Sequence, residues 1–141
     1  MRQGPSKDTV SEVDQPKLDR ILIVFLPGLG NAILLTPMLQ ALRNTHPDAT
    51  IDLFIREPVV KSLLKPSRYV DNFVYYDHTG TFLEVTNERI QAIKRLRLTN
   101  YDVIFSTGWD GMNKESLLIG CLRADQRIGY RQDCLHNLLF N

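Results

Sequence analysis

The chain has 141 residues, a formal net charge of +1 and a hydrophobic fraction of 43%. These values are typical of one globular domain with its own core, and they exclude a disordered or fibrous chain. A charge so close to zero gives no indication of nucleic-acid binding. Cys121 and Cys134 form no CxxC motif and have no histidine at metal-ligand spacing. This pattern favours a reducing cytoplasm over a structural disulfide or a metal site.

The first 17 residues are polar and contain no apolar stretch. We therefore expect a disordered tail over residues 1–17 rather than a signal peptide, followed by a folded domain over residues 18–141. The longest apolar runs, residues 21–26 and 32–35, are much shorter than the roughly 18 residues that a membrane span requires. The sequence therefore predicts a chain that does not cross a membrane.

Short runs of apolar and β-branched residues alternate with segments of helical spacing along the chain. The predicted strands cover residues 20–25, 50–55, 72–76, 101–105 and 127–130. Helices are predicted at residues 59–64, at 117–122 and in a segment that opens with Thr81 and Glu84 as a capping box.

A further helix follows the turn formed by residues 27–30. Asn31 is the expected cap, and Pro37 either kinks the helix or begins it with Thr36 as the cap. Its predicted apolar face consists of Leu34, Leu35, Met38, Leu39 and Leu42.

This alternation predicts an α/β fold of the Rossmann-like type, with a parallel sheet covered by helices on both faces. Ligands of such sheets bind beyond the carboxyl ends of the strands, where the strand order reverses. With a strand order of 3-2-1-4-5, that point lies between the first and fourth strands. The loops at residues 27–31 and 106–113 would then face each other.

The first of these loops contains Gly28, Leu29 and Gly30 immediately before a helix. Glycines allow a ligand close to the backbone, and a helix N-terminus favours an anionic oxygen. Alternatively, the glycines serve only a tight turn. Arg56, at the end of the second strand, is a further candidate for binding an anion. Ile33 replaces the third glycine of a dinucleotide fingerprint, so an NAD(P)-dependent enzyme remains only an alternative.

Four segments together carry a more specific pattern: residues 20–43, 46–57, 101–104 and 127–130. The first includes Leu-Pro-Gly-Leu-Gly-Asn-Ala-Ile-Leu-Leu-Thr-Pro, and the last is Arg-Ile-Gly-Tyr. In their order and spacing, these segments resemble glycosyltransferase family 9, the lipopolysaccharide heptosyltransferases. The resemblance covers roughly residues 17–130.

The resemblance implies one half of a GT-B fold, in which two Rossmann-type domains face each other across a cleft. The N-terminal domain would receive a glycan or lipid-linked saccharide acceptor, such as the lipopolysaccharide core. A C-terminal partner domain would bind a nucleotide sugar such as ADP-heptose. Transfer would be inverting, without a metal or a covalently bound cofactor. The implied location is the cytoplasm, at the inner face of the inner membrane, and the chain alone would be inactive.

The same family usually has an aspartate, the proposed base, at the position of Asn31. An amide cannot accept a proton near neutral pH, so either another carboxylate replaces it or activity is lost. Asp110 is the candidate replacement, with a turn-forming role before a glycine as the alternative. Thr107, Gly108 and Trp109 precede it as candidate acceptor-binding residues. Asn31 also leaves open a catalytically silent module that binds an anionic glycan or nucleotide.

Overall fold

The computed structural model of the chain describes residues 17–75, 82–107 and 118–129. The predictions for the N-terminal tail, for Tyr76 and for the Thr81 cap concern residues outside these ranges. The elements, in chain order, are β1 (Arg20–Phe25), α1 (Leu29–Thr45), β2 (Thr50–Ile55), α2 (Pro58–Leu64), the 3₁₀ helix η1 (Lys65–Ser67), β3 (Asn72–Tyr75), α3 (Phe82–Arg97), β4 (Asn100–Ser106) and β5 (Arg123–Ile128).

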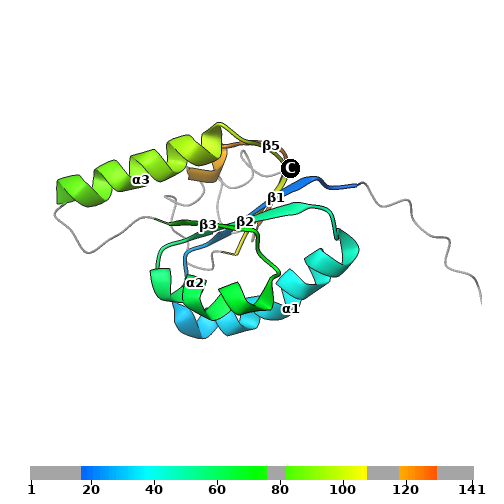
Figure 1. Cartoon of the computed structure of the whole chain (residues 1–141). Helices are drawn as coiled ribbons and strands as arrows, with labels where there is room; N and C mark the ends of the chain where they lie inside the picture. Colours follow the sequence, from blue (N-terminus) through cyan, green and yellow to red (C-terminus); the bar gives the residue numbers. More distant parts are fainter. Residues whose placement is uncertain (1–16, 76–81, 108–117, 130–141) are drawn as a thin grey trace, which may run out of the picture.

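The five strands form one sheet in the order β3-β2-β1-β4-β5, and every neighbouring pair is parallel. Helices α1 and α2 cover one face of this sheet, and α3 covers the other (Figure 1). The predicted strand order and the α/β fold class are therefore confirmed. At the centre of the sheet, Ile23 lies opposite Leu53 of β2 on one side and Phe105 of β4 on the other.

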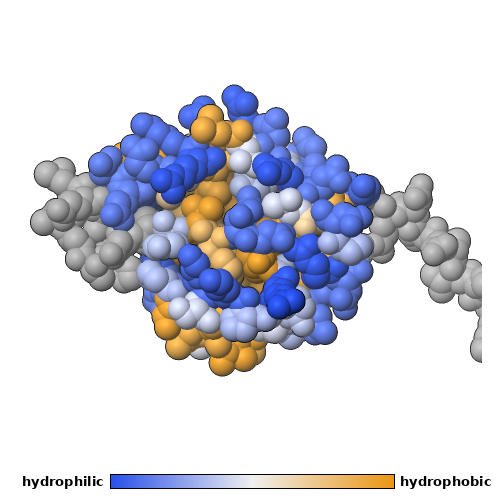
Figure 2. All heavy atoms as spheres, viewed as in Figure 1, coloured by the Kyte–Doolittle hydropathy of each residue, from blue (hydrophilic) through white to orange (hydrophobic). Residues whose placement is uncertain are grey.

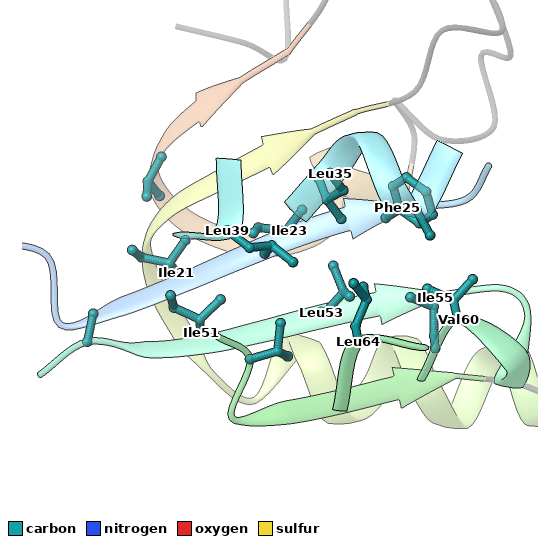
Figure 3. Packing of buried hydrophobic residues seen from close by; sticks show 14 residues of the cluster. Ile21, Ile23, Phe25, Leu35, Leu39, Ile51, Leu53, Ile55, Val60 and Leu64 are labelled. Atoms are coloured by element: carbon teal, nitrogen blue, oxygen red, sulfur yellow. The ribbon is translucent and has the colours of Figure 1, made fainter. Parts of the chain in front are cut away.

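The central strands are buried on both faces because each alternates its side chains between two apolar layers. On the α1 and α2 side, odd-numbered residues of β1 and β2 meet Leu35 and Leu39 of α1 and Val60 and Leu64 of α2 (Figure 3). These strand residues are Ile21, Ile23, Phe25, Ile51, Leu53 and Ile55. The continuous apolar runs of the sequence are thus explained by burial on both faces.

The opposite face packs Leu22, Val24 and Ile104 against Ala92 and Leu96 of α3. Leu118, Ile119 and Leu122 belong to the same layer, and residues 118–120 are helical.

This layer also contains a buried polar group. Asp52 of β2 is 7% exposed and accepts hydrogen bonds from Tyr101 Oη and Asn72 Nδ2, both at 2.8 Å. Burial, followed by the hydrogen bond to Asp52, raises the pKa of Tyr101 above its ordinary value. The group links β2, β3 and β4, so it is a structural element of the core.

Helix α1 differs from its prediction in three respects. Gly28 is the N-cap, in an extended conformation, so the prediction of Asn31 as the cap is wrong. The helix continues through Pro37, so the alternative start at Thr36 is also wrong. Packing on both sides of the proline, by Leu35 and Leu39, offsets the missing backbone donor. The third difference is Leu34, which is 76% exposed and does not belong to the buried face.

Strand β5 begins at Arg123, four residues before its predicted start at Arg127. Its sequence, Arg-Ala-Asp-Gln-Arg-Ile, lacks an apolar run because β5 is an edge strand with mostly exposed side chains. Backbone pairing with β4, from Asn100 opposite Arg123 to Phe105 opposite Ile128, defines the strand instead.

Candidate functional site

The candidate site lies beyond the carboxyl ends of β1 and β4, where the strand order reverses. From β1 the chain moves to β2 on one side, and β4 later adds to the other side. Thr107, directly after β4, donates to Val24 O of β1 through its backbone N at 3.1 Å and through Oγ1 at 3.0 Å. The two strand ends are therefore joined at this point, as the sequence predicted.

The loop after β1 is formed by Gly28 and the first turn of α1. Neither Gly28 nor Gly30 has a positive φ, so the tight-turn alternative does not explain them by backbone conformation. A β-carbon at Gly30 would meet nothing within 4 Å. Leu29 is 42% exposed and Gly30 is exposed, so the first turn of α1 is open to solvent. The free N–H groups of this turn are the groups that an incoming oxygen would meet.

Asn31 is the third residue of α1, and its backbone N donates to Gly28 O at 3.1 Å. The residue is exposed, and no side-chain capping hydrogen bond is formed at this helix end. Its amide is therefore available to orient a ligand hydroxyl, although it cannot take a proton from it.

The loop after β2 brings two charged residues to the same end of the sheet. Arg56 Nη2 lies 3.4 Å from Glu57 Oε1, and the two side chains are 46% and 29% exposed. Glu57 also lies beside the glycine loop, because a β-carbon at Gly28 would be 3.6 Å from Oε1 and 3.8 Å from Oε2. The sequence predicted a role at this position for Arg56 but not for its neighbour Glu57. Its position directly after a strand adjacent to β1 is the signal that could have identified it.

The remaining predicted site residues, Gly108, Trp109 and Asp110, lie outside the described residues, so their roles stay predictions. Among the described residues, the structure brings together Gly28, Leu29, Gly30 and Asn31 from one loop, Arg56 from the second and Thr107 from the third.

An apolar surface lies next to this site on the first turns of α1. Leu29, Ile33 and Leu34 are 42%, 61% and 76% exposed, and Val59 and Leu63 of the adjacent α2 are 48% and 42% exposed. Figure 2 shows apolar residues at the lower edge of the molecule, on the side where α1 and α2 lie. We call these five residues the apolar surface.

Neither a group of metal ligands nor a membrane-spanning helix occurs in the described parts of the chain. There, no three His, Cys, Asp or Glu side chains are grouped so that they could hold a metal ion. In the same segments, no helix has the length and apolarity needed to cross a membrane.

The fold and the site define a Rossmann-like α/β domain with its candidate ligand site at the switch point of a parallel sheet. No protein-family model matches the chain. It is 31% identical over 108 residues to lipopolysaccharide heptosyltransferase 3 from Escherichia coli K12, a match that covers 73% of this chain and 30% of that protein.

Two solved structures share the fold. A glycosyl transferase family 9 protein from Veillonella parvula DSM 2008 has a TM-score of 0.67 and 20% identity, over 84% of this chain and 38% of that one. E. coli heptosyltransferase WaaC with ADP has a TM-score of 0.64 and 19% identity, over 86% of this chain and 39% of that one. The chain is heptosyltransferase-like, and its predicted resemblance to glycosyltransferase family 9 is confirmed. It spans 30% to 39% of the length of these relatives.

Proposed function

We propose that residues 18–141 form the acceptor-side domain of a glycosyltransferase that transfers heptose or a related sugar from a nucleotide sugar to a lipopolysaccharide-core-type acceptor. The observation that carries this proposal is the bond from Thr107 to Val24 of β1, the strand that leads into the Gly28–Gly30 loop, at the switch point of a heptosyltransferase-like chain. The near-neutral charge supports a glycan partner over nucleic acid.

In this proposal the acceptor lies against the loops at the carboxyl ends of β1, β2 and β4. Arg56 binds a phosphate of the acceptor, because its guanidinium is half exposed and, within the described residues, its ion pair is a weak one with Glu57. Asn31 and Thr107 orient hydroxyl groups, and Trp109 stacks on a sugar ring. An ADP-heptose-like donor binds to a second domain, so this chain alone would not catalyse transfer.

The first test is binding of a phosphorylated inner-core saccharide to the 141-residue chain, measured by calorimetry. Arg56→Gln should weaken binding about tenfold, the equivalent of ~1.4 kcal/mol. Arg97→Gln, at the C-terminal end of α3, is the matched control and should leave affinity unchanged. Equal affinity of the Arg56 variant and the native chain would contradict the placement of the phosphate. An absence of binding to the native chain would contradict the proposed function itself.

We further propose that the apolar surface holds the chain against an anionic membrane face, where a lipid-linked acceptor would be met. Two of its five exposed residues lie in the segment 58–68, which contains Lys61, Lys65 and Arg68 and no acidic residue. Exposed apolar groups beside cations are the features that bind anionic lipid surfaces.

Sedimentation with vesicles tests this membrane contact. The chain should bind vesicles of 30% phosphatidylglycerol more strongly than vesicles of phosphatidylcholine, and the double variant Ile33→Ser, Leu34→Ser should lose most of that binding. Self-association of the native chain that this variant abolishes, without vesicle binding, would instead identify the surface as a contact between copies.

Asn31 favours a second candidate function, a catalytically silent module that binds an anionic glycan or nucleotide. Asn31→Asp in the gene product that carries this chain separates the two functions. A gain of sugar transfer supports an enzyme with a weakened site, and an unchanged absence of transfer supports the binding module. Titration with NADH tests the remaining alternative, since Glu57 beside Gly28 would also suit a ribose hydroxyl. Tight binding of NADH would displace the glycosyltransferase proposal.

A further inference from the structure

The carboxylates of the described residues are distributed unevenly over the fold. Most of them lie away from the site at the carboxyl ends of the strands. Asp19, Asp48, Asp71 and Asp102 lie near the starts of strands, Asp52 is buried under α3, Glu88 lies within α3 and Asp125 lies within β5. Among the carboxylates in the described part of the chain, Glu57 alone lies within two residues after the carboxyl end of a strand. This position places one carboxylate at the candidate site.

Two contacts fix the place of Glu57 within the site. Its strand, β2, pairs with β1 up to Ile55 opposite Phe25, so the loops that follow both strands leave the sheet together. The carboxylate oxygens lie 3.6 Å and 3.8 Å from the position of a β-carbon at Gly28. Gly28 O also accepts the backbone N–H of Asn31. Glu57 and Asn31 therefore both adjoin Gly28, one from each loop.

The Glu57 carboxylate remains available to a ligand. It caps no backbone N–H of α2, although Glu57 is the N-cap residue of that helix. Its ion pair with Arg56 is long, at 3.4 Å, and involves Oε1. With a side chain 29% exposed, the carboxylate can accept hydrogen bonds from outside the protein.

This carboxylate changes the expected chemistry of the glycine loop. An acceptor phosphate beside Gly28 would be repelled by Glu57, whereas a sugar hydroxyl would donate a hydrogen bond to it. Arg56, on the adjacent position, offers the favourable contact for the phosphate. The site therefore suits an acceptor that presents a hydroxyl to Glu57 and a negative charge to Arg56.

We propose that Glu57 is the base that removes the proton of the acceptor hydroxyl during sugar transfer, in place of the aspartate that Asn31 replaces. The proposal rests on the proposed glycosyltransferase function. The acceptor oxygen forms a bond to the anomeric carbon of the nucleotide sugar, and the bond from that carbon to the phosphate oxygen breaks. The bonding electron pair leaves with the nucleoside diphosphate, and the hydroxyl proton goes to Glu57.

The test compares variants of the gene product that carries this chain, with a nucleotide-sugar donor and a phosphorylated inner-core acceptor. Glu57→Gln should lower kcat at least 100-fold, in the range of general-base catalysis, while the KM for the acceptor changes less than threefold. Asp48→Asn, an exposed carboxylate at the start of β2, is the matched control and should keep the native kcat. The fall of kcat toward acidic pH should be lost in the Glu57 variant and kept in the Asp48 variant.

Two rescue experiments distinguish a base from a residue that only maintains structure. Asn31→Asp added to Glu57→Gln should raise kcat at least tenfold above that of Glu57→Gln alone, because it returns a carboxylate to the site. Formate added to Glu57→Ala should restore activity in proportion to its concentration. Both readouts remain informative if either Glu57 variant is less stable than the native protein.

Native-like kcat in Glu57→Gln would overturn the assignment of the base. Native protein that binds the saccharide but transfers no sugar would also overturn it, while leaving the acceptor-binding role in place. Native protein that neither binds the saccharide nor transfers sugar would contradict the proposed function instead. The failure of the inference and the failure of the function are therefore separable.

Discussion

The two ends of the sheet use their charged residues in different ways. At the end where the strands begin, carboxylates bind backbone groups. Asp102 Oδ2 accepts the N–H groups of Asp19 and Arg20 at 2.6 Å and 2.8 Å, and Asp71 Oδ2 accepts that of Ile51 at 2.8 Å. These acidic residues therefore satisfy backbone donors where β1 and β2 begin.

The end where the strands finish has fewer such bonds among the described residues. There, Thr107 binds Val24 O, and Arg56 forms a single long contact with Glu57. Polar groups that the fold does not use are the ones available to a ligand. The comparison teaches that charge alone does not identify a site in this molecule, because charged residues such as Arg43, Asp71 and Asp102 support the fold. Four predictions test the difference, in order of decreasing effect.

Arg43→Ala should have the largest effect, a loss of about 3 kcal/mol in the free energy of unfolding. Arg43 Nη1 donates to Ala49 O at 2.7 Å, and Nη2 contacts Tyr69 O at 3.2 Å and Asp71 Oδ2 at 2.6 Å. The side chain is 19% exposed, so its loss leaves partly buried acceptors without a partner. Urea unfolding measures the change. Arg97→Ala, in the last turn of α3, is the control, and an equal loss in both variants would contradict the prediction.

Tyr101→Phe should cost about 2 kcal/mol at neutral pH, because Asp52 loses its bond to the Tyr101 hydroxyl. Burial raises the pKa of Tyr101 in the folded protein above that of the unfolded chain, about 10. The unfolded chain therefore releases this proton first, and the stability from Tyr101 is present below about pH 10 and lost above it. As the pH is raised from 8 to 11, the urea concentration at the unfolding midpoint should fall for the native chain and for the control Tyr69→Phe. A similar fall in Tyr101→Phe would contradict this assignment.

Thr107→Val should cost about 1 kcal/mol, the value of one neutral hydrogen bond. The bond from Oγ1 to Val24 O is lost, but the backbone N of Thr107 still donates to the same carbonyl at 3.1 Å. The matched control is Thr45→Val at the end of α1. This threonine is exposed, and the substitution removes the hydrogen bond from its Oγ1 to Ala41 O. Thermal unfolding should rank Thr107→Val as the more destabilised variant, and the reverse order would contradict the role of Thr107 in joining β1 to β4.

The sequence predicted the central sheet because burial on both faces leaves continuous apolar runs in β1, β2 and β4. It did not predict the start of β5. Because β5 is an exposed edge strand, residues 123–126 need not be apolar. Helical spacing alone also placed Leu34 on the buried face, although the position of α1 on the sheet turns it to solvent.

The candidate site was predicted to a similar extent. Topology correctly brought the carboxyl ends of β1 and β4 together, because parallel strand ends share one edge. Glu57 was not singled out as a site carboxylate, because its approach to Gly28 depends on the direction of a side chain after β2. Asn31 was expected to cap α1, but the cap is Gly28, whose extended backbone lets the helix begin three residues earlier. Side-chain directions and helix starts depend on the folded surroundings, which local patterns do not contain.

Glu57→Gln should have the smallest effect on stability, less than about 0.5 kcal/mol. Its pair with Arg56 is exposed and long, and the carboxylate caps no backbone group, so the fold loses little when the charge is removed. Urea unfolding of this variant and of Arg43→Ala measures the two losses in the free energy of unfolding, and so compares the two ends of the sheet. A loss as large as that of Arg43→Ala would mean that the carboxyl end is also a structural edge. A small loss would mean that any defect of Glu57→Gln in sugar transfer arises from chemistry at the site, because the protein remains folded.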